Sequence, residues 1–166
     1  MQYNGNNIKD YITTLNDKQF PVCKWFVKNV HLWNTLNSYG CTPRKSLVLK
    51  FPNESIFKDT SLIKHFIRGY VDGDGTLTYT DKEHKHPEFS VLGTEDFLEG
   101  AKRYLPIKFD YKLSYNDKQQ SLITRKLQIN GYNAKEICDF LYEDSKIYLT
   151  RKYNKYLEFC RLYEKS

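Results

Sequence analysis

Two features of membrane and exported proteins are missing from this sequence. It contains no run of about 18 consecutive apolar residues, the length that a membrane-spanning helix needs. Its first residues, MQYNGNNIKD, lack the basic segment and following apolar stretch of a secretory signal. We therefore expect a soluble, cytoplasmic protein with no membrane partner.

Cysteine is scarce, and its spacing argues against two common uses. The chain has Cys23, Cys41, Cys138 and Cys160, and no two of them form a CxxC pair. Zinc knuckles and dithiol redox motifs depend on thiols at that close spacing. We therefore expect these cysteines to be reduced, buried thiols.

The charge and the aromatic content are both informative. Lys and Arg number 26 against 20 Asp and Glu, which gives a net charge of +6 and a pI near 9.0. Such a balance suits a polyanionic partner. The 14 Tyr and 10 Phe among 166 residues supply material for a hydrophobic core and argue against disorder. This length favours one main core.

The N-terminal part reads as a short unit followed by a connector. We predict a helix over residues 7–15, a strand over 21–27 and a helix over 31–39 that ends at Gly40. The segment TPRKSLVLKFPN then alternates apolar and polar residues until Pro52 breaks the run. We interpret residues 1–45 as a partial unit and residues 46–58 as a linker.

Residues 59–166 read as a complete α+β domain. Apolar residues at helical spacing predict a helix from about Asp59 to Gly75, and Thr94 caps a later one. The expected strands are 76–80, 88–92, 109–114 and 122–129, and two further helices cover 133–145 and 147–163. The order α-β-β-α-β-β-α, built from hairpins, predicts an antiparallel sheet with helices on one face.

An internal echo links the two parts. NTLNSYGCTPRKS is similar to DFLYEDSKIYLTRKY, each being a helix end followed by an Arg-Lys pair. Chance could produce such a similarity; if it is real, residues 1–45 are a partial copy that lacks its front half, because no second DGDG precedes it.

The segment FIRGYVDGDG ends its helix with two acids. Asp72 and Asp74 lie where unpaired carbonyls already carry partial negative charge, so they indicate a compensating cation, and carboxylate oxygens suit Mg²⁺. Gly69 and Gly73 are four residues apart and share a helix face that another backbone could approach closely. We therefore predict a metal site at Asp74 and helix packing at the two glycines.

The letters DGDG also fit three other structures. Asp-Gly pairs are common turn formers, so the segment could be an ordinary turn. An EF-hand loop would need glycine where Leu77 stands. DGDGTL also fits the nucleophile motif of haloacid dehalogenase-like phosphatases, with Asp72 as nucleophile, although the preceding residues have helical rather than strand periodicity. The phosphatase stays open as an alternative.

The segment HFIRGYVDGDGTL resembles the signature helix of the LAGLIDADG homing endonucleases of the DOD type. TPRKSLVLKFPN resembles the segment between the two domains of two-motif members, and FLYEDSKIYLTRKYNKY resembles the end of their second domain. The resemblance implies Mg²⁺-dependent cleavage of double-stranded DNA by a saddle-shaped sheet and two paired signature helices. Asp74 matches the metal-binding position, and Asp72 would support the helix end.

The resemblance also implies further site residues. A basic strand residue near the phosphates is expected, and Lys126 is our candidate for it. Residues that could read bases or contact phosphates alternate along the strands: Thr78, Thr80, Ser90, Lys112, Ser114, Thr124, Lys126 and Gln128.

One departure from the family stands out, because cutting both strands needs two acidic helices and this chain has one. Three explanations are open. The chain could form a homodimer through Gly69 and Gly73, or work with a separate chain that carries the other acidic helix. It could also be an inactive relic that binds DNA or RNA, in a maturase-like or regulatory role.

Overall fold

The computed structural model describes residues 8–43, 48–106, 114–115 and 124–164. Its chain divides into two compact units, Met1–Ser38 and Tyr39–Ser166. Within the described residues, no helix is long and apolar enough to cross a membrane.

Unit 1 is a β-hairpin followed by a helix. β1 (Ile8–Leu15) and β2 (Lys18–Trp25) pair antiparallel along their whole lengths. The turn residues Asn16 and Asp17 have φ angles of 48° and 60°, as the tight two-residue turn of a hairpin requires. α1 (Val30–Ser38) follows. The element order of unit 1 is therefore β-β-α.

The helix expected over residues 7–15 is wrong. This segment, IKDYITTL, is strand β1, and its β-branched Ile and Thr residues favour a strand because a helix restricts their side chains. The Asn16-Asp17 pair was the missed hairpin signal. The strand expected at 21–27 and the helix at 31–39 are present as β2 and α1 with shifted ends.

Unit 1 buries little of its apolar surface. No residue of β1, β2 or α1 is buried. Its exposed large side chains include Ile12, Leu15, Trp25, Val30 and Trp33. The buried core of the described residues consequently belongs to unit 2.

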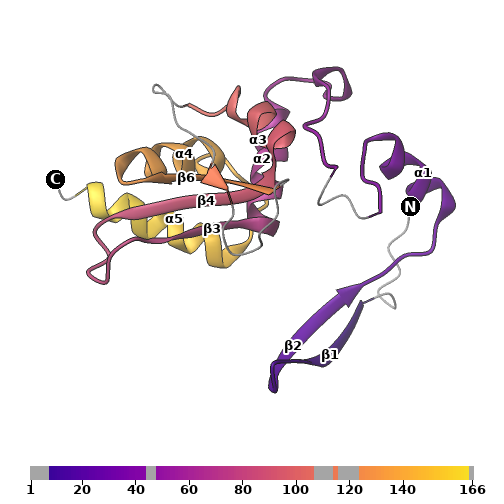
Figure 1. Ribbon diagram of the computed structural model, residues 1–166, viewed down its shortest axis with the longest axis horizontal. Coiled ribbons are helices and arrows are strands. Elements are labelled where there is room, and N and C mark those ends of the chain that lie inside the picture. Colours follow the sequence, from indigo (N-terminus) through magenta and orange to yellow (C-terminus); the bar gives the residue numbers. More distant parts are fainter. Residues whose placement is uncertain (1–7, 44–47, 107–113, 116–123, 165–166) are drawn as a thin grey trace. The chain divides into compact units, whose positions relative to one another are not determined.

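Unit 2 has the predicted α-β-β-α-β-β-α order, which a final helix extends (Figure 1). A short 3₁₀ turn, η3 (Glu54–Ile56), precedes it. The other elements are α2 (Leu62–Asp74), β3 (Gly75–Tyr79), β4 (Pro87–Thr94), α3 (Glu95–Lys102), β5 (Ser114–Tyr115), β6 (Thr124–Asn130), α4 (Tyr132–Tyr142) and α5 (Thr150–Tyr163). Residues 109–113 of the third expected strand lie outside the described residues.

The four strands of unit 2 form one antiparallel sheet in the order β3-β4-β6-β5. Figure 1 shows α4 and α5 lying along this sheet. Alternate strand residues turn toward the helices and are buried, among them Leu77, Phe89, Val91, Leu127 and Ile129. They pack with Ile63, Ile67 and Val71 of α2 and with Ile137 and Leu141 of α4. The α+β class with an antiparallel sheet is therefore confirmed.

The second half of the expected linker packs on unit 2. Phe51 lies 5.6 Å from the ring centroids of both Phe66 and Phe97, and 5.5 Å from that of Tyr104. The Thr94 hydroxyl donates a hydrogen bond to the Leu49 carbonyl. Residues 49–57 thus form part of the surface of unit 2 beside α2 and α3.

This contact makes Gly100 of α3 sensitive to substitution. A methyl group at Gly100 would lie 2.2 Å from Cβ of Phe51, well inside van der Waals contact, and the backbone would have to shift. We expect Gly100→Ala to destabilise the protein by about 1–3 kcal/mol in urea unfolding. In Gly69→Ala, the matched control, the methyl group meets no heavy atom within 4 Å. That variant should gain up to about 1 kcal/mol of helix propensity, and equal losses in both would contradict the prediction.

The cysteines follow the sequence prediction only in part. All four are free thiols, with Cys138 buried and Cys160 half-buried. Cys23 and Cys41 are exposed, so the expectation that all would be buried is wrong. Cys23 lies in the hairpin of unit 1, which buries none of its residues. Burial raises the pKa of the Cys138 thiol and keeps it protonated.

Candidate nucleic-acid interface and acidic helix end

The C-terminal end of α2 receives a cation from α5. Lys152 is only 2% exposed, and its ammonium donates to the carbonyls of Val71, of Asp72 at 2.9 Å and of Gly75 at 2.5 Å. Burial and the Arg151 charge lower the pKa of Lys152, while the Asp72 and Asp74 carboxylates oppose that shift. The sequence predicted a cation beside the unpaired carbonyls at this helix end. The ammonium of Lys152 is a cation that binds them.

Asp72 joins the end of α2 to the chain between α4 and α5. Its Oδ1 accepts a 2.7 Å hydrogen bond from the Tyr142 hydroxyl, and its Oδ2 accepts one of 3.0 Å from the Leu149 amide. Burial, together with the Asp72 carboxylate, raises the pKa of Tyr142 and keeps its hydroxyl protonated. Both carboxylate oxygens of Asp72 thus link the end of α2 to Tyr142 and Leu149.

The Asp74 carboxylate has fewer contacts than that of Asp72. Asp74 is the last residue of α2 and is exposed. Among the described residues its carboxylate makes no hydrogen bond and no ion pair. Burial, and then the negative charge of Asp74, raise the pKa of nearby Tyr70 to about 12. Asp74 is therefore the acid at this helix end that remains accessible to a ligand.

The fit of Asp74 to Mg²⁺ can be judged from its surroundings. No group of three or more His, Cys, Asp or Glu side chains that could hold a metal ion occurs within the described residues. Mg²⁺ commonly takes one or two protein carboxylates and completes its shell with phosphate oxygens and water. Asp74 fits such a shared site, in which nucleic acid or a second acidic helix supplies the remaining ligands.

α2 also presents an exposed stripe of side chains. Leu62, Phe66, Gly69 and Gly73 share one helix face and are all exposed. A methyl group placed on either glycine would meet no heavy atom within 4 Å. The two glycines of this α2 stripe are therefore uncovered within the described residues, and helix packing on them stays a prediction.

The outer face of the sheet brings together most of the predicted contact residues. Opposed residues in the register share a face, so Thr76, Ser90 and Gln128 form one row across β3, β4 and β6. By the same alternation Thr78, Thr124 and Lys126 lie on this face. We call it the open face, because the helices pack on the other one.

The other residues predicted to contact DNA are buried, hydrogen-bonded within the protein or outside the described residues. Ser90 is only 5% exposed, so little of its side chain is accessible to a partner. Thr80 follows the end of β3, where its amide and hydroxyl both donate to the His86 carbonyl. Ser114 is opposite Lys126 in β5, but its side chain lies outside the described residues, as does all of Lys112.

Three polar side chains contact one another on the open face. Lys126 Nζ donates to Gln128 Oε1 at 2.6 Å and lies 3.5 Å from Glu88 Oε1. Gln128 Nε2 in turn donates to Glu88 Oε2 at 3.2 Å. We call these residues the Glu88 triplet. Glu88 was not among the predicted site residues, although its alternation with Phe89 on β4 places it on this face.

Lys126 and Lys152 therefore lie in different surroundings. Lys126 is on β6, which β4 separates from β3, so its backbone is about two strand spacings, or roughly 10 Å, from the strand that Asp74 leads into. Lys152 instead binds the end of α2 itself. One signal could have identified Lys152, because a cation in the first turn of a helix is unfavourable and needs another reason to be there.

No protein-family model matches the chain, and no curated protein matches it. No activity, substrate or cofactor is therefore carried over from a relative. Three features carry the functional inference: the exposed Asp74 at the end of α2, the α2 stripe, and the polar open face of the sheet.

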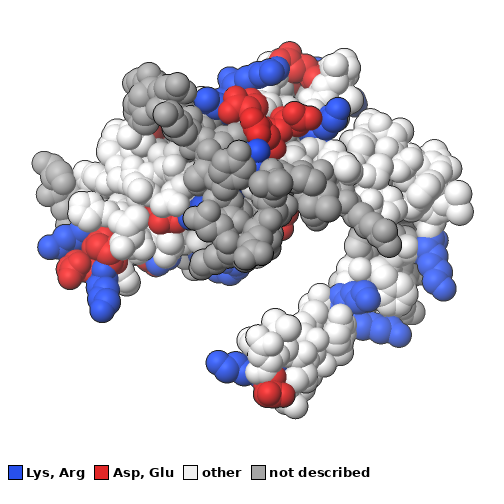
Figure 2. All heavy atoms as spheres, viewed as in Figure 1, with Lys and Arg blue, Asp and Glu red and all other residues white. Residues whose placement is uncertain are grey.

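Charged groups are interspersed rather than gathered into one basic patch on the face that Figure 2 draws. A hollow of about 570 Å³ beside α3 has the same mixed character. It is lined by Lys50 and Arg103 together with Glu54, Asp96 and Glu99. This mixed lining indicates neither an anionic nor a cationic ligand.

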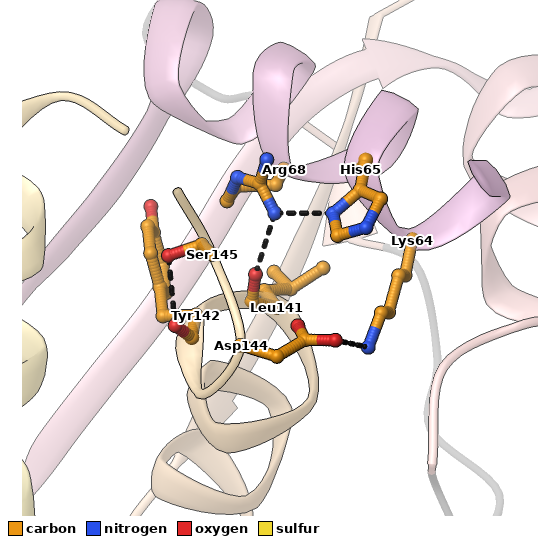
Figure 3. Close-up of polar contacts among 7 residues, drawn as sticks. All are labelled: Lys64, His65, Arg68, Leu141, Tyr142, Asp144 and Ser145. Atoms are coloured by element: carbon orange, nitrogen blue, oxygen red, sulfur yellow. Dashed lines mark hydrogen bonds and ion pairs between the residues drawn. The ribbon is translucent and has the colours of Figure 1, made fainter. Parts of the chain in front are cut away.

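A second polar cluster fastens α2 to the end of α4 (Figure 3). Arg68 is 7% exposed, and its Nη1 lies 2.5 Å from His65 Nδ1 and 3.2 Å from the Leu141 carbonyl oxygen. Since arginine is always a donor, His65 accepts through Nδ1 and is neutral. Beside this contact, Lys64 Nζ forms an ion pair with Asp144 Oδ2 at 2.6 Å. The cluster thus depends on an uncharged His65.

Stability should accordingly fall as the solution becomes mildly acidic. Burial, followed by the Arg68 charge, lowers the pKa of His65 below 6.5, against an opposing effect of Asp144. The unfolded chain then binds the proton more readily than the folded one, so stability is lost as pH falls from 6.5 toward the lower folded pKa. Urea unfolding between about pH 7.5 and pH 5 should show this loss.

His65→Asn is the matched control for this effect, because asparagine can accept from Arg68 but does not titrate. Its free energy of unfolding should change less over that pH range than that of the wild type. Asp144, whose pKa is lowered chiefly by Lys64, acts only as pH approaches 3.8 and below. Equal pH slopes in the two proteins would contradict the role of His65.

Proposed function

We propose that this protein is a LAGLIDADG-type, DOD-class homing endonuclease-like protein that binds double-stranded DNA and hydrolyses its phosphodiester bonds with Mg²⁺. The observation that carries the proposal is the exposed, unpaired carboxylate of Asp74, which ends a helix leading straight into a sheet with a polar open face. The α-β-β-α-β-β-α order of unit 2 supports it, because the motif resemblance implies this arrangement.

Three parts of the chain have separate roles in this proposal: Asp74, Lys152 and the open face. Asp74 binds Mg²⁺, which when bound stabilises the attacking water and the leaving oxygen. Lys152 fixes the last turn of α2 and neutralises its carbonyls, so Asp74 is held in one place. The open face lies along the duplex and makes contacts with bases and phosphates.

The second acidic helix comes from a partner that packs on the α2 stripe. This partner is either another copy of the chain or a separate chain that carries the other acidic helix. The β-β-α order of unit 1 matches that of β5, β6 and α4, which supports its description as a partial copy. Its exposed apolar side chains also suit a half-domain that another segment covers.

A binding protein without activity is the second candidate. One observation favours it, since Asp74 is a single carboxylate and no further acids gather around it within the described part of the chain. Such a protein would bind DNA or RNA through the same open face. The phosphatase alternative is disfavoured, because both oxygens of Asp72 are engaged by Tyr142 and Leu149.

The test is cleavage of plasmid DNA that contains the chain's own insertion locus. Purified protein should convert supercoiled plasmid to the nicked form in Mg²⁺ and not in excess chelator. A monomer with one Asp74 should nick a single strand, whereas a dimer should give linear product, and sedimentation measures which is present. If neither form of cleavage occurs but the duplex is bound in a salt-dependent way, the binding protein is the correct reading. Release of phosphate from a small phosphoester would instead favour the phosphatase.

A further inference from the structure

The Glu88 triplet spans β4 and β6 on the open face, and a carboxylate there is unusual for a surface that meets DNA. A carboxylate repels phosphates, so a face built only to neutralise the DNA backbone would not carry Glu88 there. Glu88 instead sits within bonding distance of both Lys126 and Gln128. This placement suits the reading of base edges better than the binding of phosphate.

The two bonds of Gln128 fix its amide in one orientation. Oε1 accepts from the Lys126 ammonium and Nε2 donates to the Glu88 carboxylate. Exchanging Oε1 and Nε2 would set a donor against Lys126 and an acceptor against Glu88, so only one orientation satisfies both neighbours. The amide is therefore held in place before any partner arrives.

The fixed amide keeps one donor and one acceptor for a partner. A glutamine amide has two N–H groups and two oxygen lone pairs, and among the described residues one of each is used. A donor beside an acceptor matches N7 and N6 of adenine in the major groove, where glutamine can bond both at once. Guanine presents two acceptors at the same edge and would leave the amide oxygen facing an acceptor.

We propose that Gln128 is a specificity-determining residue that reads an adenine in the major groove, with Glu88 and Lys126 as the residues that position its amide. The proposal rests on the proposed function, because it needs duplex DNA on the open face. It adds the kind of base pair that the Glu88 triplet selects.

The experiment is selection from a pool of duplex DNA with a randomised core, followed by affinity measurements on the selected sites. The wild type should enrich one position for adenine, and replacing that base pair should weaken binding by about tenfold. Gln128→Met, which keeps the length of the side chain without its polar atoms, should lose that preference at the one position only. Asn130→Ala, on the same face but outside the triplet, should keep it.

Glu88→Met tests the positioning. It leaves Gln128 in place but removes the acceptor that orients its Nε2, so adenine preference should fall while the protein remains folded by thermal unfolding. If the wild type enriches a site and Gln128→Met enriches the same site equally well, Gln128 does not read a base, and DNA binding itself stands. Failure of the wild type to enrich any duplex would overturn this inference together with the proposed function.

Discussion

Asp74→Asn should abolish Mg²⁺-dependent cleavage and leave the protein as stable as the wild type. Losing the charged ligand removes several kcal/mol of transition-state stabilisation, so we expect the cleavage rate to fall by at least about 100-fold. Stability should stay within about 0.5 kcal/mol, because Asp74 is exposed and its carboxylate has no hydrogen-bond partner among the described residues. DNA binding, measured by gel shift in the absence of Mg²⁺, should persist.

Asp72→Asn is the matched control, two residues earlier on the same helix. An amide in place of the carboxylate turns one of its two acceptors into a donor, which faces either the Tyr142 hydroxyl or the Leu149 amide. We expect a loss of about 1–3 kcal/mol in urea unfolding. Its cleavage should persist at temperatures where it remains folded. The opposite result, a stable Asp72→Asn without activity beside an active Asp74→Asn, would make Asp72 the functional acid.

The fold of unit 2 was readable from sequence because its signals are local. Apolar residues at helical spacing located α2, and acids after Thr94 located the start of α3. In unit 1 the same approach failed at residues 7–15, where a pattern over few residues fits either a helix or a strand. The hairpin there depends on the turn conformation of Asn16 and Asp17. The Asn16-Asp17 turn distinguishes a hairpin from a helix here, which the apolar periodicity does not.

The site was only partly readable, because its main interactions join residues that are distant in the chain. Lys152 lies 80 residues from Asp72, whose carbonyl it binds, and its place in the first turn of α5 is a signal that does not name this partner. Lys126 was chosen for its place on a strand, but its bonds to Gln128 and Glu88 depend on the pairing of β4 with β6. Sequence could nominate Asp74 and the α2 glycines, whereas the positions of the lysines required the fold.

The buried Lys152 ammonium gives the second large prediction. An ammonium has three N–H donors, and all of them are directed at main-chain carbonyls near the end of α2. Lys152→Met keeps the length and apolar character of the side chain but leaves those carbonyls without this donor. Since hydrogen bonds to charged groups are stronger than neutral ones, we expect a loss of about 3 kcal/mol in urea unfolding. That corresponds to a melting temperature lower by roughly 10 °C for a chain of this size.

Lys155→Met, one turn further along α5, separates this effect from the loss of any lysine. Lys155 is paired with Glu158 at 2.5 Å and lies over the Tyr79 ring, but its side chain is partly exposed. Its removal should therefore cost less than about 1 kcal/mol. If both variants lose the same small amount, Lys152 does not hold the helix end. If Lys152→Met alone is strongly destabilised, this variant should lose cleavage activity at a lower temperature than Lys155→Met. The reason is that Lys152 anchors the last turn of α2, which carries Asp74.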